Sequence, residues 1–257
     1  MPPLPPSPTK TESSAGAESR CHYLDWDSQF FGRRIGSIRE AQLSTNAIVE
    51  IEQWCANNRI DCLYFLADFG DPETIRLAEE HDFRLVDIRL TLAMNPPISL
   101  DPVSCSSTIR PSRILDVPVL RTIARTNHRD SRFYFDPHFP RERCDSLYET
   151  WIEKSFQGLA DAVFVPELDG RPAGYITCTV KPDKSGQIGL VGLAPEARGK
   201  GLAFELVQTA LRWFSSRGVR QVTVVTQGRN IRAQRLYQRS GFATESVRLW
   251  YHRWFVS

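Results

Sequence analysis

The sequence lacks long apolar segments and an excess of charge of either sign. No uninterrupted apolar run among its 257 residues approaches the ~20 residues that a membrane-spanning helix needs, and the N-terminal part lacks the apolar core of a signal peptide. We therefore expect a cytoplasmic protein without membrane insertion. Lys and Arg number 32 and Asp and Glu 30, a net charge of +2, which argues against a nucleic acid or a charged membrane surface as partner.

Cysteines with metal or redox spacing are also missing. The six cysteines include no C-x-x-C pair and several lie in apolar runs, which is typical of reduced, buried thiols. No cluster of His, Cys and Asp has the spacing of metal ligands, so we expect no metal. Two phosphate motifs are absent too, because no Gly-x-Gly-x-x-Gly occurs and Gly199-Lys200 lacks the other P-loop residues. The cysteines are Cys21, Cys55, Cys62, Cys105, Cys144 and Cys178.

What is present divides the chain into two candidate domains. Residues 1–20 are poor in apolar side chains and indicate a disordered tail, and the Pro- and Ser-rich residues 96–107 indicate a linker. The candidate domains are residues 21–95 and 108–257. In both, short apolar runs alternate with segments of helical periodicity, which predicts a mixed α+β (α/β) fold.

The periodicity predicts the individual elements as well. Pro72 suits the first position of a helix behind an Asp71 cap, and Asp169-Gly170-Arg171 is a hairpin turn signal. Residues 127–139 are polar, aromatic and interrupted by proline, which indicates a loop. The expected helices cover 46–58, 71–81, 116–123, 141–156, 202–214 and 230–240, and the expected strands 62–67, 83–92, 162–167, 173–180, 188–193, 219–226 and 242–255.

A glycine-rich basic loop between a predicted strand and helix is the candidate functional element. The strand 188–193 is followed by Arg198-Gly199-Lys200-Gly201, and a helix begins at Leu202. The first helical N–H groups have no partner within the helix and the helix dipole is positive there, while glycine lets a ligand approach the backbone closely. This order suits an anion, phosphate above all. The alternative is an ordinary, solvated basic turn.

Two motifs resemble those of the GCN5-related N-acetyltransferase (GNAT) family, whose members use acetyl-CoA. The first is Arg-x-x-Gly-x-Ala at Arg198, Gly201 and Ala203, and the second is the segment from Asn230 to Phe242, Asn-x-x-Ala-x-x-Leu-Tyr-x-x-x-Gly-Phe. The resemblance covers residues 108–257. It implies a GNAT fold for that domain, with acetyl-CoA as co-substrate.

The resemblance also implies roles for single residues. The strand at 191–193 would separate from its neighbour and bind the pantetheine arm, the amides of 199–203 would hold the pyrophosphate, and Tyr237 would protonate the leaving thiolate. A tyrosine suits that role because its ordinary pKa of ~10 keeps it protonated at neutral pH. Two alternatives stay open: Tyr237 as a core aromatic and Asn230 as a plain helix cap. The implied cofactor residues are Val191, Gly192, Leu193, Arg198, Gly199, Lys200, Gly201, Leu202, Ala203, Asn230 and Ala233.

The chain contains a candidate internal repeat. Residues 66–83 can be laid over residues 225–242 with one constant offset, 242 − 83 = 159, and both copies show a strand, a polar cap, an amphipathic helix, Phe and a strand. The first copy has Ala78 in place of Tyr237 and no glycine-rich loop. We therefore predict that residues 21–95 form a degenerate, GNAT-like domain. A chance match of two similar units is the alternative.

Over nearly the whole chain after residue 20, the sequence resembles the acetyltransferases of TDP-4-amino sugars, the dTDP-fucosamine acetyltransferases. Short segments carry this resemblance: Trp26 with Phe30-Phe31-Gly32, residues 131–133, residues 151–153 and Thr226-Gln227. It implies a nucleotide-sugar amine as acceptor in surface-polysaccharide biosynthesis. One departure leaves the acceptor open: the loop Pro-Glu-Ala-Arg-Gly-Lys-Gly is fuller than the shorter loop of the best-known dTDP-fucosamine acetyltransferases.

The implied acceptor site would combine aromatic and basic side chains. Aromatic rings stack on a flat base, and an arginine binds phosphate in a fork. The alternative is an aromatic loop that covers the core. The adjacent Phe30 and Phe31 leave a choice between one ring in a pocket or interface and a turn that buries both. The implied acceptor residues are Phe31, Ser131, Arg132, Phe133 and Tyr134.

Three further points stay open at this stage. The general base is not identified among His128, Asp130 and Glu153, because a sugar amine needs no strong base. The acceptor is a protein amine or another small-molecule amine in one alternative, and in another the chain is a non-catalytic sensor of acyl-CoA. A homodimer is compatible with every one of these interpretations.

Overall fold

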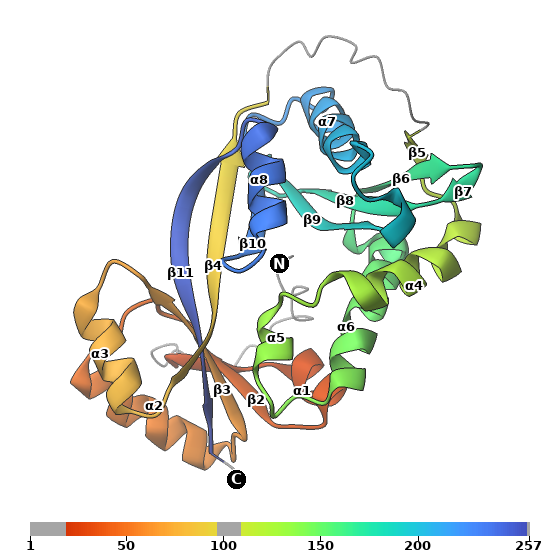
Figure 1. Ribbon diagram of the computed structural model, residues 1–257. Helices are drawn as coiled ribbons and strands as arrows, with labels where there is room; N and C mark the ends of the chain where they lie inside the picture. The colour runs from red at the N-terminus through yellow and green to blue at the C-terminus, as the bar shows by residue number, and fades with distance from the viewer. Residues whose placement is uncertain (1–18, 97–108, 256–257) are drawn as a thin grey trace. The chain divides into compact units, whose positions relative to one another are not determined.

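The computed structural model describes residues 19–96 and 109–255 (Figure 1). It divides into two compact units. Unit 1 comprises residues 90–96, 109–134 and 140–246, and unit 2 comprises residues 19–89, 135–139 and 247–255. Within the described ranges, no helix combines the length and the apolar character needed to cross a bilayer.

Unit 1 is built on a sheet with the strand order β4-β10-β9-β8-β6-β5. The pairs β5–β6, β6–β8 and β8–β9 are antiparallel and β9–β10 is parallel. The predicted hairpin turn is present, with β7 (Arg171–Pro172) pairing back onto β6. The strands of this order are β4 (Arg84–Met94), β10 (Val222–Gln227), β9 (Gly186–Leu193), β8 (Gly174–Val180), β6 (Ala162–Leu168) and β5 (Ile109–Pro111).

Helices cover this sheet, and Figure 1 shows α7 on one side of β8 and β9 and the pair α4 and α6 on the other. The predicted apolar face of α7 is confirmed, because Leu206, Ala210 and Phe214 are fully buried. A short 3₁₀ turn, Ile114–Asp116, precedes α4, and a π turn, Ser155–Leu159, follows α6. The helices are α4 (Val117–Asn127), α6 (Arg141–Lys154), α7 (Leu202–Ser215) and α8 (Ile231–Arg239).

Unit 2 has its own core and contains the first strands of the same mixed sheet. The strand order is β1-β2-β3-β11, with β2–β3 parallel and β1–β2 and β3–β11 antiparallel. Its core includes Ile48 and Ile51 of α2, Phe65 of β3 and Leu77 of α3. The elements are β1 (Cys21–Tyr23), α1 (Asp25–Phe31), β2 (Ile35–Ile38), α2 (Thr45–Asn57), β3 (Cys62–Asp68), α3 (Pro72–Glu80) and the end of β11 (Ala243–Trp254).

The local structure differs from the sequence prediction at three places. The aromatic stretch at Phe30-Phe31 is the end of α1, where Phe31 is buried, Phe30 is half-buried and the two rings pack edge-on at 5.0 Å. Asp71 precedes α3 as predicted, but its carboxylate accepts from the Thr74 hydroxyl (2.6 Å) and caps no backbone N–H. Within the predicted loop 127–139 lies a short helix, α5 (Arg132–Phe135), because Arg132 and Phe133 are buried.

Two strands contribute residues to both units. In chain order β4 follows α3 of unit 2, yet its residues 90–94 belong to unit 1, where β4 neighbours β10. Likewise β11 follows α8 of unit 1, yet Arg248–Trp254 pair with Cys62–Asp68 of β3 in unit 2. The units are therefore not the two continuous segments 21–95 and 108–257 of the sequence analysis. The predicted linker 96–107 and tail 1–20 lie almost wholly outside the described residues.

The two copies of the proposed repeat have the same order of elements. Helices α3 and α8 are both nine residues long, and their first and last residues differ by the predicted offset of 159 (231 − 72 and 239 − 80). Each helix lies between two strands and is followed by Phe83 or Phe242. Both phenylalanines are buried. The order of elements is what a repeat would produce.

Candidate active site

The strands β9 and β10 of unit 1 separate along their length. Their parallel pairing ends at Ile188 and Val224, although β9 continues to Leu193 and β10 to Gln227. The β9 edge that faces away from β8 therefore has no β10 partner beyond Ile188. A backbone edge of this kind can pair with an extended ligand in place of a strand.

A bulge in β9 marks the start of this opening. Ile176 of β8 is opposite Val191, whereas Cys178 is opposite Ile188, so two residues of β9 face Thr177 alone. The Thr177 hydroxyl accepts from the Leu190 N–H (2.7 Å), which satisfies the amide that the bulge displaces. Bulges of this kind redirect backbone groups next to functional sites.

Beyond the bulge, the backbone amides of β9 alternate between its two edges. The Leu193 N–H points away from β8, because it donates to Oδ1 of Asn127 (3.2 Å), and the Ala194 N–H points back to Ala173 (2.9 Å). Amides two residues apart face the same edge of a strand. The Val191 N–H therefore faces the opening.

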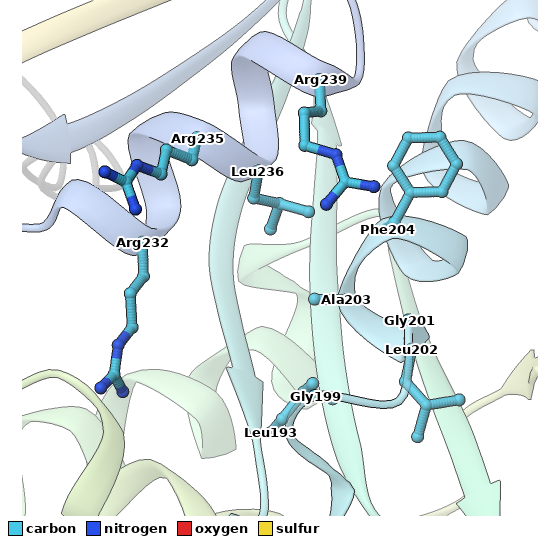
Figure 2. Close-up of a pocket in the computed structure, with 10 residues that line it drawn as sticks. All are labelled: Leu193, Gly199, Gly201, Leu202, Ala203, Phe204, Arg232, Arg235, Leu236 and Arg239. Atoms are coloured by element: carbon cyan, nitrogen blue, oxygen red, sulfur yellow. The ribbon is translucent and has the colours of Figure 1, made fainter.

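The glycine-rich loop follows β9 and leads into α7 as predicted. Gly199 (φ 77°) and Gly201 (φ 81°) have left-handed backbone conformations, and Gly201 is the N-cap residue of α7. Such conformations are strained for residues with a side chain. The first amides of α7 are thereby presented to a cavity of about 380 Å3 that is lined by residues of the loop and of α8. Its lining is Leu193, Gly199, Gly201, Leu202, Ala203, Phe204, Arg232, Arg235, Leu236 and Arg239 (Figure 2).

A second cavity, of about 60 Å3, lies between the separated strands and α8. Asn230 caps α8 by accepting from the Ala233 N–H (3.1 Å), as the sequence predicts. Ala233 and Tyr237 lie one turn apart on the helix face toward this cavity. The lining is His128, Asp130, Tyr148, Gly189, Leu190, Val191, Val225, Thr226, Gln227, Asn230, Ala233 and Tyr237.

Two side chains that line the second cavity, Tyr237 and His128, have shifted pKa values. Burial raises the pKa of Tyr237 above its ordinary value, so this tyrosine is protonated throughout the neutral range but is a weaker acid than the sequence argument assumes. Burial lowers the pKa of His128 to about 3, so His128 is neutral near pH 7. Its Nε2 lies 2.8 Å from the Tyr175 hydroxyl, and its ring stacks on Tyr148 at 4.4 Å.

Three predicted cofactor residues do not line these cavities. Gly192 is buried against Tyr175, whose hydroxyl would lie 2.6 Å from an added Cβ, so the position requires glycine for packing. The Arg198 guanidinium donates to the Leu193 carbonyl and to Asn127, both at 3.4 Å, and braces the end of β9. Lys200 is exposed on the loop.

The predicted acceptor residues are not among the lining residues of either cavity. Ser131, Arg132 and Phe133 are buried. The Tyr134 hydroxyl donates to Asp145 (2.6 Å). Phe31 belongs to unit 2, where its ring lies 4.5 Å from that of Phe139. The structure therefore does not support an acceptor-binding role for these five residues.

Among the three candidate bases, the structure brings two to the cavity. His128 and Asp130 line it together with Tyr148, whereas Glu153 of α6 lies 3.4 Å from Arg121 in an ion pair. Sequence reasoning missed Tyr148, which comes from α6 and shows no local motif.

Sequence reasoning also missed the basic side of the first cavity. Three arginines of α8 line it: Arg232, Arg235 and Arg239. Their spacing of three and four residues, which places side chains on one helix face, is the signal that was available. Among the described residues, no group of three or more His, Cys, Asp or Glu side chains is arranged to hold a metal ion.

A protein-family model matches the part of the chain that contains the two cavities. Residues 124–242 match the model of the acetyltransferase (GNAT) family. This segment contains β9, the glycine-rich loop and α8, and therefore most of the residues that line the two cavities.

Curated relatives match over different shares of their length. The dTDP-fucosamine acetyltransferase of Escherichia coli is 28% identical over 90% of this chain and 96% of its own length. The spore coat polysaccharide biosynthesis protein SpsD of Bacillus subtilis is 30% identical over 64% of this chain, and the match spans only 56% of SpsD. A mycothiol acetyltransferase of Thermomonospora curvata is 35% identical over 40% of this chain and 33% of its own length.

A solved structure has a similar fold along most of the chain. The GCN5-related N-acetyltransferase from Sphaerobacter thermophilus superposes with a TM-score of 0.62 at 19% identity, over 91% of this chain and 76% of its own. The family model identifies residues 124–242 as an acetyltransferase (GNAT) domain, and the acetyltransferase relatives and the similar fold agree with this assignment.

Proposed function

We propose that the protein transfers the acetyl group of acetyl-CoA to the amine of a dTDP-4-amino-4,6-dideoxy sugar. The GNAT domain at residues 124–242 and the acetyltransferase relatives support an acetyl-CoA-dependent N-acetyltransferase. The observation that carries the proposal is that the opening between β9 and β10, the glycine-rich loop and Tyr237 border two cavities of one unit.

The donor fits the order of groups along these cavities. The loop amides at Gly199–Ala203 suit a pyrophosphate, and the unpaired edge of β9 suits the amide-bearing pantetheine arm. The arm then ends where Val191 and Tyr237 meet in the second cavity. In this proposal the cofactor residues of the sequence analysis keep their roles, except that Gly192 and Arg198 act by packing and bracing.

The chain's own groups can carry out the transfer. The Val191 N–H donates to the thioester oxygen as negative charge develops on it. The acceptor nitrogen forms the new bond to the acetyl carbon, the carbon–sulfur bond breaks, and the Tyr237 hydroxyl gives its proton to the departing thiolate. The proton that the amine loses leaves by way of water on the side of His128 and Asp130.

The acceptor is proposed from the relatives and from the chemistry of the second cavity. The dTDP-fucosamine acetyltransferase matches nearly its whole length, and SpsD is named for polysaccharide biosynthesis. Hydrogen-bonding groups such as Asp130, Thr226 and Gln227 suit sugar hydroxyls. The proposal includes a cytoplasmic enzyme of surface-polysaccharide biosynthesis. A second candidate, another small-molecule amine, is favoured by the mycothiol acetyltransferase relatives.

The test measures thiol release from acetyl-CoA with a panel of acceptors. The panel contains dTDP-4-amino-4,6-dideoxy-hexoses, amines of glucosamine derivatives and amine-bearing peptides. Turnover with the nucleotide sugars and none with the others supports the proposal. Turnover with another small amine alone selects the second candidate. Tight acetyl-CoA binding without turnover on any acceptor would make the protein an acyl-CoA sensor. Sedimentation of the same preparation decides between a monomer and a homodimer.

A further inference from the structure

Three arginines occupy one face of α8 beside the glycine-rich loop. Arg232, Arg235 and Arg239 are exposed, and all three line the first cavity. We refer to these three residues as the arginine face. Figure 2 shows the side chains leaving the helix, with Arg239 directed toward Phe204 at the start of α7.

The arginine face differs from other arginines of the chain in its acidic neighbours. Among the described residues, no Asp or Glu oxygen lies within ion-pair distance of its three guanidinium groups, in contrast to other arginines of the chain. Arg76 bonds to Glu73 (2.6 Å) and Glu80, Arg110 to Asp116 (2.7 Å), and Arg125 to Glu149 (2.9 Å). Within the described part of the chain, no carboxylate therefore neutralises the positive charge of the cavity.

Within a helix, this arrangement is unfavourable without a ligand. Like charges three and four residues apart repel one another, and α8 is only nine residues long. The helix dipole favours a cation at Arg239 in the last turn but not at Arg232 in the first. An anion in the cavity would relieve the repulsion of all three groups.

Coenzyme A has more anionic groups than the glycine-rich loop binds. The pyrophosphate of the proposed donor can be held by the amides of Gly199–Ala203 alone. Coenzyme A carries one more anion, the 3′-phosphate on its adenosine, next to a flat base. Phe204 gives the same cavity an aromatic ring beside Arg239, and aromatic rings stack on flat bases.

We infer that the arginine face binds the 3′-phosphate of coenzyme A, with Phe204 against the adenine, so that the protein distinguishes coenzyme A from dephospho-coenzyme A. The inference rests on the proposed function, because it assumes an acetyl-CoA donor. It assigns Arg232, Arg235 and Arg239 as donor-specificity residues outside the two motifs of the sequence analysis. Arg239 makes the largest contribution, because its side chain is directed along the cavity toward Phe204.

The test compares the affinities of acetyl-CoA and acetyl-dephospho-CoA by isothermal titration calorimetry. The wild type should bind acetyl-CoA at least ~10-fold more tightly, since a charge-assisted hydrogen bond commonly contributes that much. Arg239→Gln should lower this ratio several-fold, and Arg235→Gln with Arg239→Gln should bring it close to one. The affinity for acetyl-dephospho-CoA should stay within ~2-fold of the wild type in both variants, which also shows that they are folded.

Arg171→Gln is the matched control. It removes the same charge from β7, away from the cavity, and should leave the ratio unchanged. Adenosine 3′,5′-bisphosphate should compete better than AMP with the wild type and equally with the double variant. Inorganic phosphate should compete weakly, because it lacks the adenine that packs against Phe204 in the inferred site.

The outcomes separate the inference from the proposed function. Equal affinity of the wild type for the two donors, or an unchanged ratio in the double variant, would overturn the inference and leave acetyl-CoA as donor. A wild type that binds neither donor would overturn the proposed function as well.

Discussion

Tyr237 combines burial with a place in the second cavity. Its side chain is 4% exposed and its ring packs edge-on against Phe242 at 5.9 Å. The raised pKa keeps the hydroxyl protonated. The hydroxyl can therefore donate a hydrogen bond and a proton, and it cannot act as a base at neutral pH.

The variant Tyr237→Phe distinguishes the role of the hydroxyl from that of the aromatic ring. The substitution removes one oxygen and keeps the packing, so we expect kcat to fall ~10- to 1000-fold with little change in acetyl-CoA affinity. Stopped-flow thiol release and calorimetry measure the two quantities. The control is Tyr251→Phe, which removes the hydroxyl of a buried tyrosine of unit 2. An unchanged kcat in Tyr237→Phe would exclude the role as acid.

His128 links the same cavity to the pH dependence of stability. Burial lowers its pKa from an ordinary ~6.5 to about 3, so between these values the unfolded chain binds a proton that the folded chain does not. The contribution of His128 to the free energy of unfolding is then fully present above pH ~6.5. It is lost on the order of 1 kcal/mol per pH unit as the pH falls toward 3.

His128→Gln should remove this slope and keep a hydrogen-bond partner for Tyr175. We expect the difference between the unfolding free energies of wild type and variant to shrink steadily from pH 6.5 downward. Urea titrations at a series of pH values measure it, with His81→Gln of unit 2 as a control for composition. Two curves that stay parallel over this range would contradict the assignment.

At the scale of elements, the short segment 135–139 is fastened to the end of β11 within unit 2. The Asp136 carboxylate, 3% exposed, accepts from Nδ1 of His252 (2.6 Å), from Nε1 of Trp254 (2.8 Å) and from Nδ1 of His138 (2.8 Å). Burial alone would raise the pKa of this carboxyl, but these donors outweigh burial and hold the pKa well below its ordinary range. One ionised side chain thus satisfies three side-chain donors and the backbone N–H of His138 (3.1 Å).

Asp136→Ala should remove the carboxylate to which Nδ1 of the buried His252 and the indole of Trp254 donate. We expect a loss of about 3–5 kcal/mol of unfolding free energy, typical of removing one member of a buried charged network. Asp136→Asn, which keeps an acceptor oxygen, should lose less. Chemical denaturation of the two variants beside the wild type gives both values, and equal losses would show that shape rather than charge matters at this position.

The sequence predicts elements well where the signal is local. The loop from Arg198 to Gly201 and the cap at Asn230 depend on residues a few positions apart, and both are found as predicted. Asp136 was not singled out, because its partners His252 and Trp254 lie 116 and 118 residues away in the chain.

The predicted acceptor site was not supported, because local composition does not show whether a loop binds a ligand or packs in the core. The composition of residues 131–134 suits a nucleotide, yet three of the four side chains are buried. Aromatic and basic residues have the same composition in a binding loop and in a packed one. Only the tertiary fold, which brings Tyr148 of α6 to His128, separates the two cases.

At the scale of the whole molecule, each unit is completed by a strand from the other half of the chain. Unit 1 needs residues 90–94 of β4 beside β10, and unit 2 needs Arg248–Trp254 beside β3. A candidate domain cut out at residue 108, as the sequence analysis divides the chain, would lose the first of these strands. The exposed edge of β10 would then favour aggregation.

Two fragments, residues 1–102 and 103–257, test this interdependence. Each fragment alone should be largely unfolded or aggregated, because its sheet lacks a strand and its apolar face lacks cover. Co-expressed, they should form a 1:1 complex with the circular dichroism spectrum and the acetyl-CoA affinity of the intact chain. Light scattering after size exclusion measures the stoichiometry. A stable, monomeric 103–257 fragment that binds acetyl-CoA as the intact chain does would show that unit 1 needs no strand from the N-terminal half. In that case the donor site would depend on β9, the glycine-rich loop and α8 alone.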